Sequence, residues 1–287
     1  MKTLERLIEN KTKMVDTLTD NIPTLKNHDR VVLFLEYDGG GYHGYQMQNE
    51  TIPTIQMSLE NALHNLTNLS HRVTAASRTD RGVNAFGQVV SFAHQSNLDL
   101  HTYQRGMNYH LPKDIVVNNA FWAPPNFHVR SSAISRTYRY TIINRRSRPA
   151  IDRYRAAHIS TSLDFGMMET AIQMIKGTID VRPFTGSWDE NDDPYRRFDK
   201  VSISNHLDTI TVEMEASGFV THQIRRMMGA IVQVGLGEMR VDKFKRLLIN
   251  GSTGEASWMM PSEGLCLISV KYEGFPPEIE RNQYAEN

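Results

Sequence analysis

The sequence predicts an α+β protein built from two similar halves with mostly antiparallel sheets, and three observations predict this class. Residues alternate between apolar and polar in several short segments of both halves, a pattern typical of strands. Each half also contains a segment with apolar residues at helical spacing. The 287 residues are enough for one large domain or two of medium size. We therefore expect halves at 30–130 and 131–275 joined across a central cleft, with an extension at 1–29 and a tail at 276–287.

The first half begins with a strand predicted over Val31–Asp38, which runs into the three glycines Gly39–Gly41. A helix follows, with apolar residues from Ile55 to Leu66 on one stripe and Pro53 in its first turn. Three more strands are predicted at Arg72–Ala76, Gln88–Phe92 and Ile115–Trp122.

The second half repeats the order of strand, helix and strands. Its first strand is predicted over Arg136–Ile143, which is rich in Thr, Tyr and Ile. In the helix that follows, Ser162 is the expected N-cap and Gly177 the expected stop. The remaining elements are two alternating strands at 197–206 and 209–216, a helix at 221–235 and a closing strand at 264–273.

The composition excludes several classes of protein. The single cysteine, Cys266, excludes a disulfide scaffold and any CxxC zinc or redox site. No apolar run approaches the length of a membrane span, and the first 28 residues contain too many acidic residues for a signal or transit peptide. Because the net charge is zero, binding to a polyanion would require basic residues gathered on one face. We expect a cytoplasmic protein that is not attached to a membrane, with a mitochondrial or nuclear location left open.

Two loops invite a cofactor or metal interpretation. The glycines Gly39, Gly41 and Gly44 satisfy the dinucleotide pattern G-x-G-x-x-G after a strand. However, the helix should begin at that loop so that its N-terminal amides meet the pyrophosphate, and here the segment 45–52 intervenes. A flexible turn is therefore the better interpretation. The acidic loop Asp189–Asp193 lacks the spacing of a calcium loop, so we expect a solvated connection there.

The stretch "SRTDRG" places Asp80 between Arg78 and Arg81. The simplest explanation is a solvated surface ion pair, worth less than about 1 kcal/mol. Two other features favour a functional site: the arginine pair Arg225 and Arg226 on a predicted helix, and the Tyr-Arg-Tyr strand. An arginine partner favours the ionised form of an aspartate, which suits a nucleophile better than a proton donor. Arginines also contact phosphates, and tyrosines stack on unpaired bases for roughly 1 to 3 kcal/mol each.

Five ordered motifs along nearly the whole chain resemble those of the TruA family of tRNA pseudouridine synthases. "SRTDRGV" resembles the family's R-T-D-x-G-V, and "YDGGGYHGYQMQ" its opening Y-D-G-x-x-[FY]-x-G-[WY]-Q. "RTYRYTI" is similar to its K-x-Y-x-Y strand, "ASGFVTHQIRRMMG" to its arginine-bearing helix and "MPSEGLCL" to its A-P-x-x-G-L-x-L ending. The chain departs from the family at Ser77, Asn84, Met260 and "GTIDVRPF" (177–184), and none of these positions touches the R-T-D core.

The resemblance implies that the protein isomerises uridine in tRNA to pseudouridine without a cofactor or metal. By the same resemblance, the modified positions are expected in the anticodon arm. By the same resemblance, Asp80 would be the catalytic nucleophile or initiating base, and the halves would enclose an RNA-binding cleft. Arg78 would occupy the space left by the flipped base, and Tyr138 would stack on the uracil. Arg225 would orient the Asp80 carboxylate, and Leu265 would form an apolar wall.

RNA binding beyond this site is expected from the arginine-rich stretch 136–155, in which Asp152 is the only acidic residue. We assign backbone contacts there to Arg145, Arg146 and Arg148. Similar enzymes act as homodimers or as monomers, and the sequence leaves both open. The alternative function is that of a catalytically inactive RNA-binding relative, which would lack the carboxylate or its arginine, whereas Asp80 and Arg225 are both present.

Overall fold

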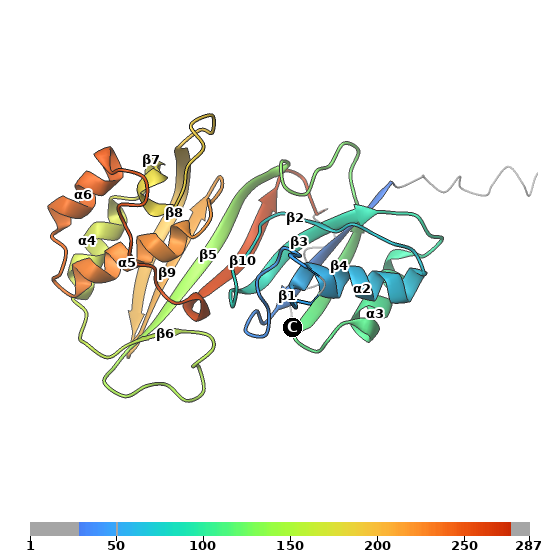
Figure 1. Ribbon diagram of the computed structural model, residues 1–287, viewed down its shortest axis with the longest axis horizontal. Helices are drawn as coiled ribbons and strands as arrows, with labels where there is room; N and C mark the ends of the chain where they lie inside the picture. The colour runs from blue at the N-terminus through green and yellow to red at the C-terminus, as the bar shows by residue number, and fades with distance from the viewer. Residues whose placement is uncertain (1–28, 50, 277–287) are drawn as a thin grey trace, which may run out of the picture.

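The computed structural model describes residues 29–49 and 51–276, and the predictions for residues 1–28 and 277–287 lie outside that range. The described strands form one continuous sheet in the order β4-β1-β3-β10-β5-β9-β8-β7, with β2 beside β3 and β6 beside β5 (Figure 1). Most neighbours are antiparallel, while β10 with β3 and β5 with β6 are parallel. The predicted α+β class with mostly antiparallel strands is confirmed, and the two halves share a single sheet.

The strands of the first half lie close to their predicted positions. They are β1 (Arg30–Tyr37), β2 (Thr74–Ala75), β3 (Asn84–Ala93) and β4 (Ile115–Trp122). The second half contributes β5 (Ala133–Asn144), β6 (Ala157–Ile159), β7 (Gly177–Asp180), β8 (Tyr195–His206), β9 (Thr209–Ala216) and β10 (Leu265–Tyr272). The last of the described strands, β10, pairs with β3 on one side and with β5 on the other, so it joins the two halves.

Five α-helices in the described residues cover the sheet in two groups (Figure 1). Helices α2 (Ile55–Thr67) and α3 (Leu100–His110) belong to the first half. Helices α4 (Phe165–Gln173), α5 (Gln223–Gly235) and α6 (Val241–Asn250) belong to the second, together with the short 3-10 turns η1 (Arg182–Phe184) and η2 (Ser262–Gly264). The sequence interpretation did not include α3, α6, β6 or β7.

The ends of two predicted helices need correction. In α2 the N-cap is Thr54, whose hydroxyl accepts a hydrogen bond from the Met57 amide, so Pro53 precedes the helix and does not lie in its first turn. In α4 the N-cap is Asp164 and not Ser162, because the Asp164 carboxylate accepts from the Met167 amide. The helix ends by Met174, before Gly177. An aspartate nearer the first helical turn satisfies the free amides directly, which the apolar spacing alone does not reveal.

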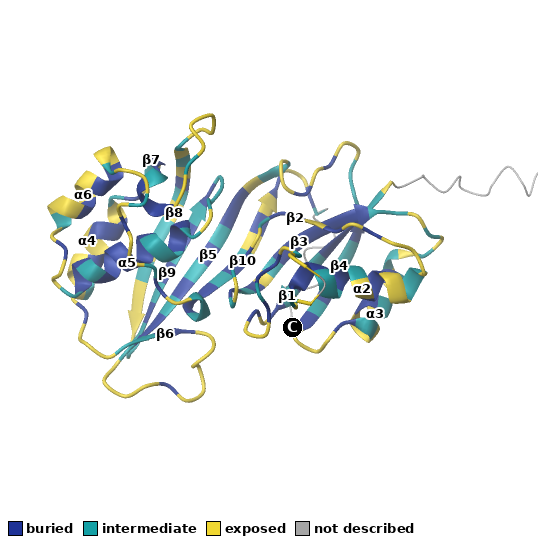
Figure 2. Cartoon of the chain, in the orientation of Figure 1, coloured by how far each residue is buried: buried dark blue, intermediate teal, exposed yellow. Residues whose placement is uncertain are grey.

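The core follows the alternation of the strands. In β9 buried side chains such as Ile210, Val212 and Met214 alternate with half-buried ones, so one face of the sheet packs into the core. Figure 2 shows buried residues along the central strands and exposed ones on the outer helix faces and the loops. The acidic loop Asp189–Asp193 is exposed, as expected for a solvated connection.

Candidate active site

The glycine-rich loop after β1 supports the segment that contains Asp80. The Tyr45 amide donates to the Thr79 carbonyl at 3.0 Å, and the Gly82 amide donates to the Tyr42 carbonyl at 3.3 Å. Gly44 has φ +94°, and a Cβ added there would lie 2.9 Å from the Thr79 carbonyl oxygen. The glycines therefore permit close backbone approach, and the loop serves as a cradle for residues 79–82.

Asp80 follows the short strand β2 and lies at the boundary between the two halves. Its Oδ2 atom is 3.4 Å from Nη1 of Arg225 and 3.8 Å from Nε2 of His222. The Asp80 side chain is 24% exposed, so it is shielded but open to a ligand. The preceding residue, Thr79, is held by a hydrogen bond of 2.8 Å between its hydroxyl and that of Tyr37. The pairing of Asp80 with Arg225 that the resemblance implies is thus present in a partly buried setting, and the described residues show no ion pair of Asp80 with Arg78 or Arg81.

Arg225 is held in place independently of Asp80. It lies in the first turn of α5, and its Nε donates to the Met260 carbonyl at 2.8 Å. Its side chain is only 13% exposed, which limits the orientations that the guanidinium can adopt. An arginine fixed in this way directs one of the two oxygens of the Asp80 carboxylate.

Tyr138 lies in the middle of β5 with its ring buried. Its hydroxyl is hydrogen-bonded to the Ser77 hydroxyl at 2.9 Å, and its ring meets that of Phe219 edge to face at 5.2 Å. Burial is the main cause that raises the pKa of Tyr138 to about 12. The hydrogen bond with Ser77 lowers this pKa, and the nearby charge of Asp80 raises it. The phenol is therefore neutral at physiological pH and presents an apolar ring with a fixed orientation.

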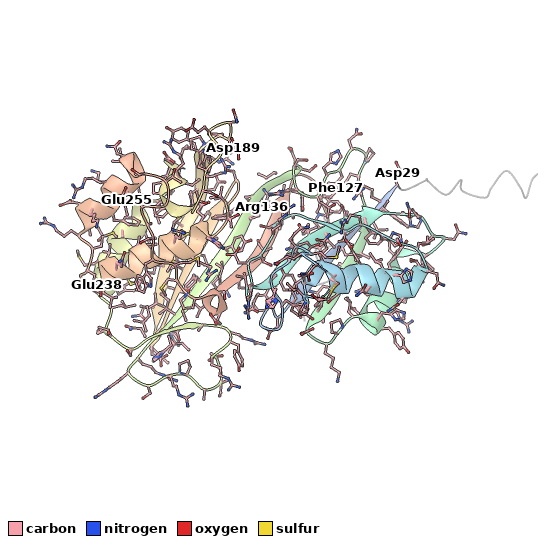
Figure 3. The ribbon with its side chains drawn as sticks, in the orientation of Figure 1. Asp29, Phe127, Arg136, Asp189, Glu238 and Glu255 are labelled. Carbon is pink, nitrogen blue, oxygen red and sulfur yellow. The ribbon has the colours of Figure 1, made fainter. Side chains whose placement is uncertain are left out.

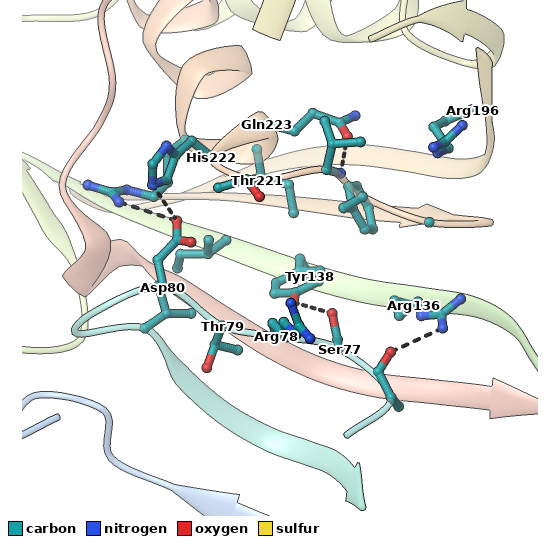
Figure 4. A pocket seen from close by; sticks show the side chains of 18 of the residues that line it. Ser77, Arg78, Thr79, Asp80, Arg136, Tyr138, Arg196, Thr221, His222 and Gln223 are labelled. Carbon is teal, nitrogen blue, oxygen red and sulfur yellow. Dashed lines mark hydrogen bonds and ion pairs between the residues drawn. The ribbon is translucent and has the colours of Figure 1, made fainter. Parts of the chain in front are cut away.

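A cavity of about 390 Å³ brings these groups together (Figure 4). All five residues assigned to catalysis and substrate binding from the sequence line it: Arg78, Asp80, Tyr138, Arg225 and Leu265. The first three come from the first half and from β5, whereas Arg225 and Leu265 come from α5 and the start of β10. The structure thus assembles the predicted set, while the role of each residue stays a prediction.

His222 is a cavity residue that the sequence reasoning missed. It precedes α5, and its φ of +63° is a left-handed backbone conformation that residues other than glycine rarely adopt. This backbone directs the imidazole toward Asp80 (Figure 4). The signal was present in the sequence, because His222 lies three positions before Arg225 in the quoted "HQIR" motif. Arg130 and Arg196 also line the cavity and were not predicted.

Arg136 was expected on a basic RNA-binding face, and this expectation is wrong. Only 8% of the residue is exposed, and it lies at the centre of the molecule between the two halves (Figure 3). Its guanidinium donates to the carbonyls of Ala76, Arg130, Ala133 and Ser217 at 2.6–3.3 Å. Burial lowers the pKa of this guanidinium. Arg136 therefore ties four backbone segments around the cavity and is not free to contact RNA.

The rest of the arginine-rich stretch has more acidic partners than the sequence suggested. Arg145 pairs with Asp208 at 2.9 Å, and Arg139 pairs with Glu213 at 2.7 Å. Both acids come from β9 or the turn before it, which lies beside β5. Arg146 and Arg148 are exposed. None of the three arginines assigned to the RNA backbone lines the cavity.

Two further properties concern the described residues only. Within 29–49 and 51–276, no group of three or more His, Cys, Asp or Glu side chains is arranged to hold a metal ion. None of the helices in this part of the chain has the length and apolar character needed to cross a bilayer.

Comparisons with known proteins agree with the sequence resemblance. The family model described as tRNA pseudouridine synthase matches residues 34–130 and 171–273. The tRNA pseudouridine synthase A of Glaesserella parasuis is 37% identical over 243 residues, which cover 85% of this chain and 92% of that protein. The tRNA pseudouridine synthase A of Shewanella amazonensis is 36% identical over 243 residues, covering 85% and 93%. A solved Cbf5-Nop10-Gar1 complex is a distant match, at 9% identity over 83% of this chain and 57% of that one, with a TM-score of 0.36.

Proposed function

This chain belongs to the tRNA pseudouridine synthase family, and from that premise we propose that it isomerises uridine to pseudouridine in the anticodon arm of tRNA, with Asp80 initiating the reaction. The observation that best supports this proposal is the setting of Asp80. Its carboxylate is held by a fixed arginine, opens into a cavity of about 390 Å³ and lies beside a buried tyrosine ring. That volume falls within the usual range for sites that bind small molecules.

The proposed reaction needs no outside reactant. The bond between N1 of uracil and C1′ of ribose breaks, the base turns, and a bond forms between C5 and C1′. The proton on C5 leaves, and N1 takes up a proton, so atoms and electrons balance. Asp80 acts at the sugar or the ring as nucleophile or initiating base, because its ionised carboxylate has an electron pair to offer.

The target base must leave its stack before Asp80 can reach it. In our proposal Arg78, which is exposed at the cavity rim, fills the vacated space or steers the nucleotide. Tyr138 then stacks on the uracil, Leu265 forms an apolar wall, and Arg225 keeps Asp80 oriented. We further propose that Arg146 and Arg148 contact the RNA backbone outside the cavity, with a smaller share for Arg145 because it is already paired with Asp208.

The proposal is tested by the site of modification. Purified protein should release tritium from tRNA labelled at C5 of uridine, and modification mapping should show the product in the anticodon arm. Mapping of RNA from cells that lack the gene should show loss of the same sites. Lost sites in rRNA or mRNA would overturn the tRNA assignment, and sites elsewhere in tRNA would overturn the anticodon-arm assignment. Light scattering of the protein with and without tRNA tests the homodimer that the family resemblance allows.

A further inference from the structure

The charges that line the cavity do not balance. Asp80 is the only carboxylate among the lining residues. Against it stand the arginines at positions 78, 130, 136, 196 and 225. Gathering this many positive charges in one concave space costs free energy unless an anion joins them.

Two of these arginines are already satisfied. Arg225 is paired with Asp80 and with the Met260 carbonyl. Arg136 is buried and donates to four backbone carbonyls. Neither guanidinium is free to bind a ligand without giving up these bonds.

Arg130 and Arg196 are in a different situation, since within the described part of the chain neither side chain has an acidic partner. Nη1 of Arg196 donates to the Tyr195 carbonyl at 2.8 Å and to the Asp193 carbonyl, which orients the guanidinium without neutralising it. Arg130 is placed through its backbone, because its carbonyl accepts from Nη2 of Arg136 at 2.6 Å. Both residues thus line the cavity without an acidic partner in the described residues, and Arg130 also borders a second pocket beside Arg30 and His128.

Arg196 and the backbone of Arg130 lie away from the reacting carboxylate. In Figure 4, Asp80 and Arg196 are at opposite ends of the cavity, and Arg136, whose guanidinium binds the Arg130 carbonyl, lies toward the Arg196 end. Uracil and ribose are uncharged, so a flipped uridine beside Asp80 and Tyr138 leaves the charge at the far end uncompensated. The anion that is covalently attached to that uridine is a backbone phosphate.

We propose that Arg130 and Arg196 bind a backbone phosphate that directly flanks the flipped uridine. This inference rests on the proposed function and extends it, because it makes the far end of the cavity a site for the polynucleotide and not only for a nucleoside. Arginine suits the task, since its planar guanidinium can bind two phosphate oxygens at once. A phosphate held there fixes the uridine at both ends, with the base on Tyr138 and the backbone on the two arginines.

The test combines protein variants with a neutral phosphate replacement. Three tRNAs are assembled by ligation: one unmodified, and two with a methylphosphonate on the 5′ or the 3′ side of the mapped uridine. Filter binding is measured for each with wild type, Arg130→Ala and Arg196→Ala. Each variant should weaken binding of the unmodified tRNA by about 10-fold, the effect of losing a charge-assisted hydrogen bond. On one of the two methylphosphonate tRNAs, the same variants should cause almost no further loss.

Two controls make the result specific. Arg246→Ala, an exposed arginine on α6 outside the cavity, should leave binding of all three tRNAs unchanged. A fourth tRNA with a methylphosphonate several nucleotides away should retain the full effect of Arg130→Ala and Arg196→Ala. If the losses from variant and methylphosphonate simply add on both flanking tRNAs, the phosphate assignment is wrong. Failure of wild type to convert unmodified tRNA would instead overturn the proposed function, so the two failures are distinct.

Discussion

Two sets of arginines in this protein have different surroundings. Around the cavity, Arg136 and Arg225 are mostly buried and held by several bonds to backbone carbonyls or to Asp80. On the loop after β5, Arg146 and Arg148 are exposed, and Arg145 pairs with Asp208 at the surface, where both side chains are about 40% exposed. The same side chain thus serves two purposes: fixed geometry where a reaction is proposed, and adaptable charge where a long polyanion is expected.

This difference predicts which property of the protein each substitution should change. A buried guanidinium with fixed partners positions other groups, so its loss should change rate or stability. An exposed guanidinium acts through long-range attraction, which salt screens, so its loss should change affinity in a salt-dependent way. Substitutions in both groups test this contrast, starting with the Asp80 carboxylate that Arg225 holds.

The largest effect is expected from Asp80→Asn. The amide keeps the size of the side chain but removes its charge and its nucleophilicity. We expect the single-turnover rate to fall by at least about 10³-fold, or about 4 kcal/mol of barrier, while tRNA binding persists. Tritium release from C5-labelled tRNA with enzyme in excess measures the rate, and Asp192→Asn on an exposed loop is the control. A variant that keeps more than about a tenth of the wild-type rate would exclude Asp80 as the reacting group.

Arg225→Met should come next. The substitution keeps an unbranched apolar stem but leaves the Asp80 carboxylate without the partner at 3.4 Å that directs it. We expect the single-turnover rate to fall by about 10²-fold, as for a reacting group displaced by about 1 Å. Arg246→Met on the exposed face of α6 should leave the rate unchanged. Equal rates for both variants would show that the fixed ion pair is dispensable.

Arg136→Leu should act on stability. The substitution leaves four carbonyls around the cavity without their donor, and we expect a loss of about 2 kcal/mol in the free energy of unfolding. Arg139→Leu is the matched control on the same strand, because its ion pair with Glu213 is about 40% exposed and should be worth less than about 1 kcal/mol. Urea denaturation of both variants measures the difference. Similar losses would remove the distinction between the fixed and the exposed arginines.

The smallest effect is expected from replacing Arg145, Arg146 and Arg148 together by Ala. This variant should bind tRNA more weakly, and the dependence of log K on log salt should flatten by up to about 0.9 for each phosphate of a duplex-like arm that is no longer neutralised. The limiting rate on bound tRNA should barely change. A variant with only Arg146 and Arg148 replaced should show most of the effect, because Arg145 is paired with Asp208. An unchanged salt slope would place the backbone contacts on another face.

Much of the fold followed from local patterns in the sequence. The strands Ile115–Trp122 and Thr209–Ala216 were predicted with their observed ends, because alternation of apolar residues reports one buried face directly. Helices α3 and α6 were missed. The former combines few apolar residues with many polar ones, and only Tyr103 and Met107 are buried. Such a helix is stabilised by the sheet that it covers, which a local pattern does not contain.

The candidate site could be predicted where its residues belong to sequence motifs. It could not be predicted where burial or ion pairing depends on residues that are distant in the sequence. Asp80, Tyr138 and Arg225 lie far apart in sequence and were grouped through the family resemblance, and the structure brings them to one cavity. The burial of Arg136 could not be predicted, because its four acceptors come from three other segments besides its own. For the same reason, a local count of charges could not reveal the acids that pair with Arg139 and Arg145, which lie on β9 and in the turn before it.

The position of β10 has a consequence for biosynthesis. This strand is made after every other strand and helix described here, yet it joins β3 to β5, and its first residue, Leu265, lines the cavity. A nascent chain that has left the ribosome only as far as α6 can fold parts of each half, as domains do during synthesis. Such a chain lacks β10, the strand that connects the sheets of the two halves. It therefore also lacks the wall of the cavity that Leu265 forms. Translation that stops before β10 therefore yields a fragment without Leu265 and without the strand between β3 and β5, so its cavity is incomplete.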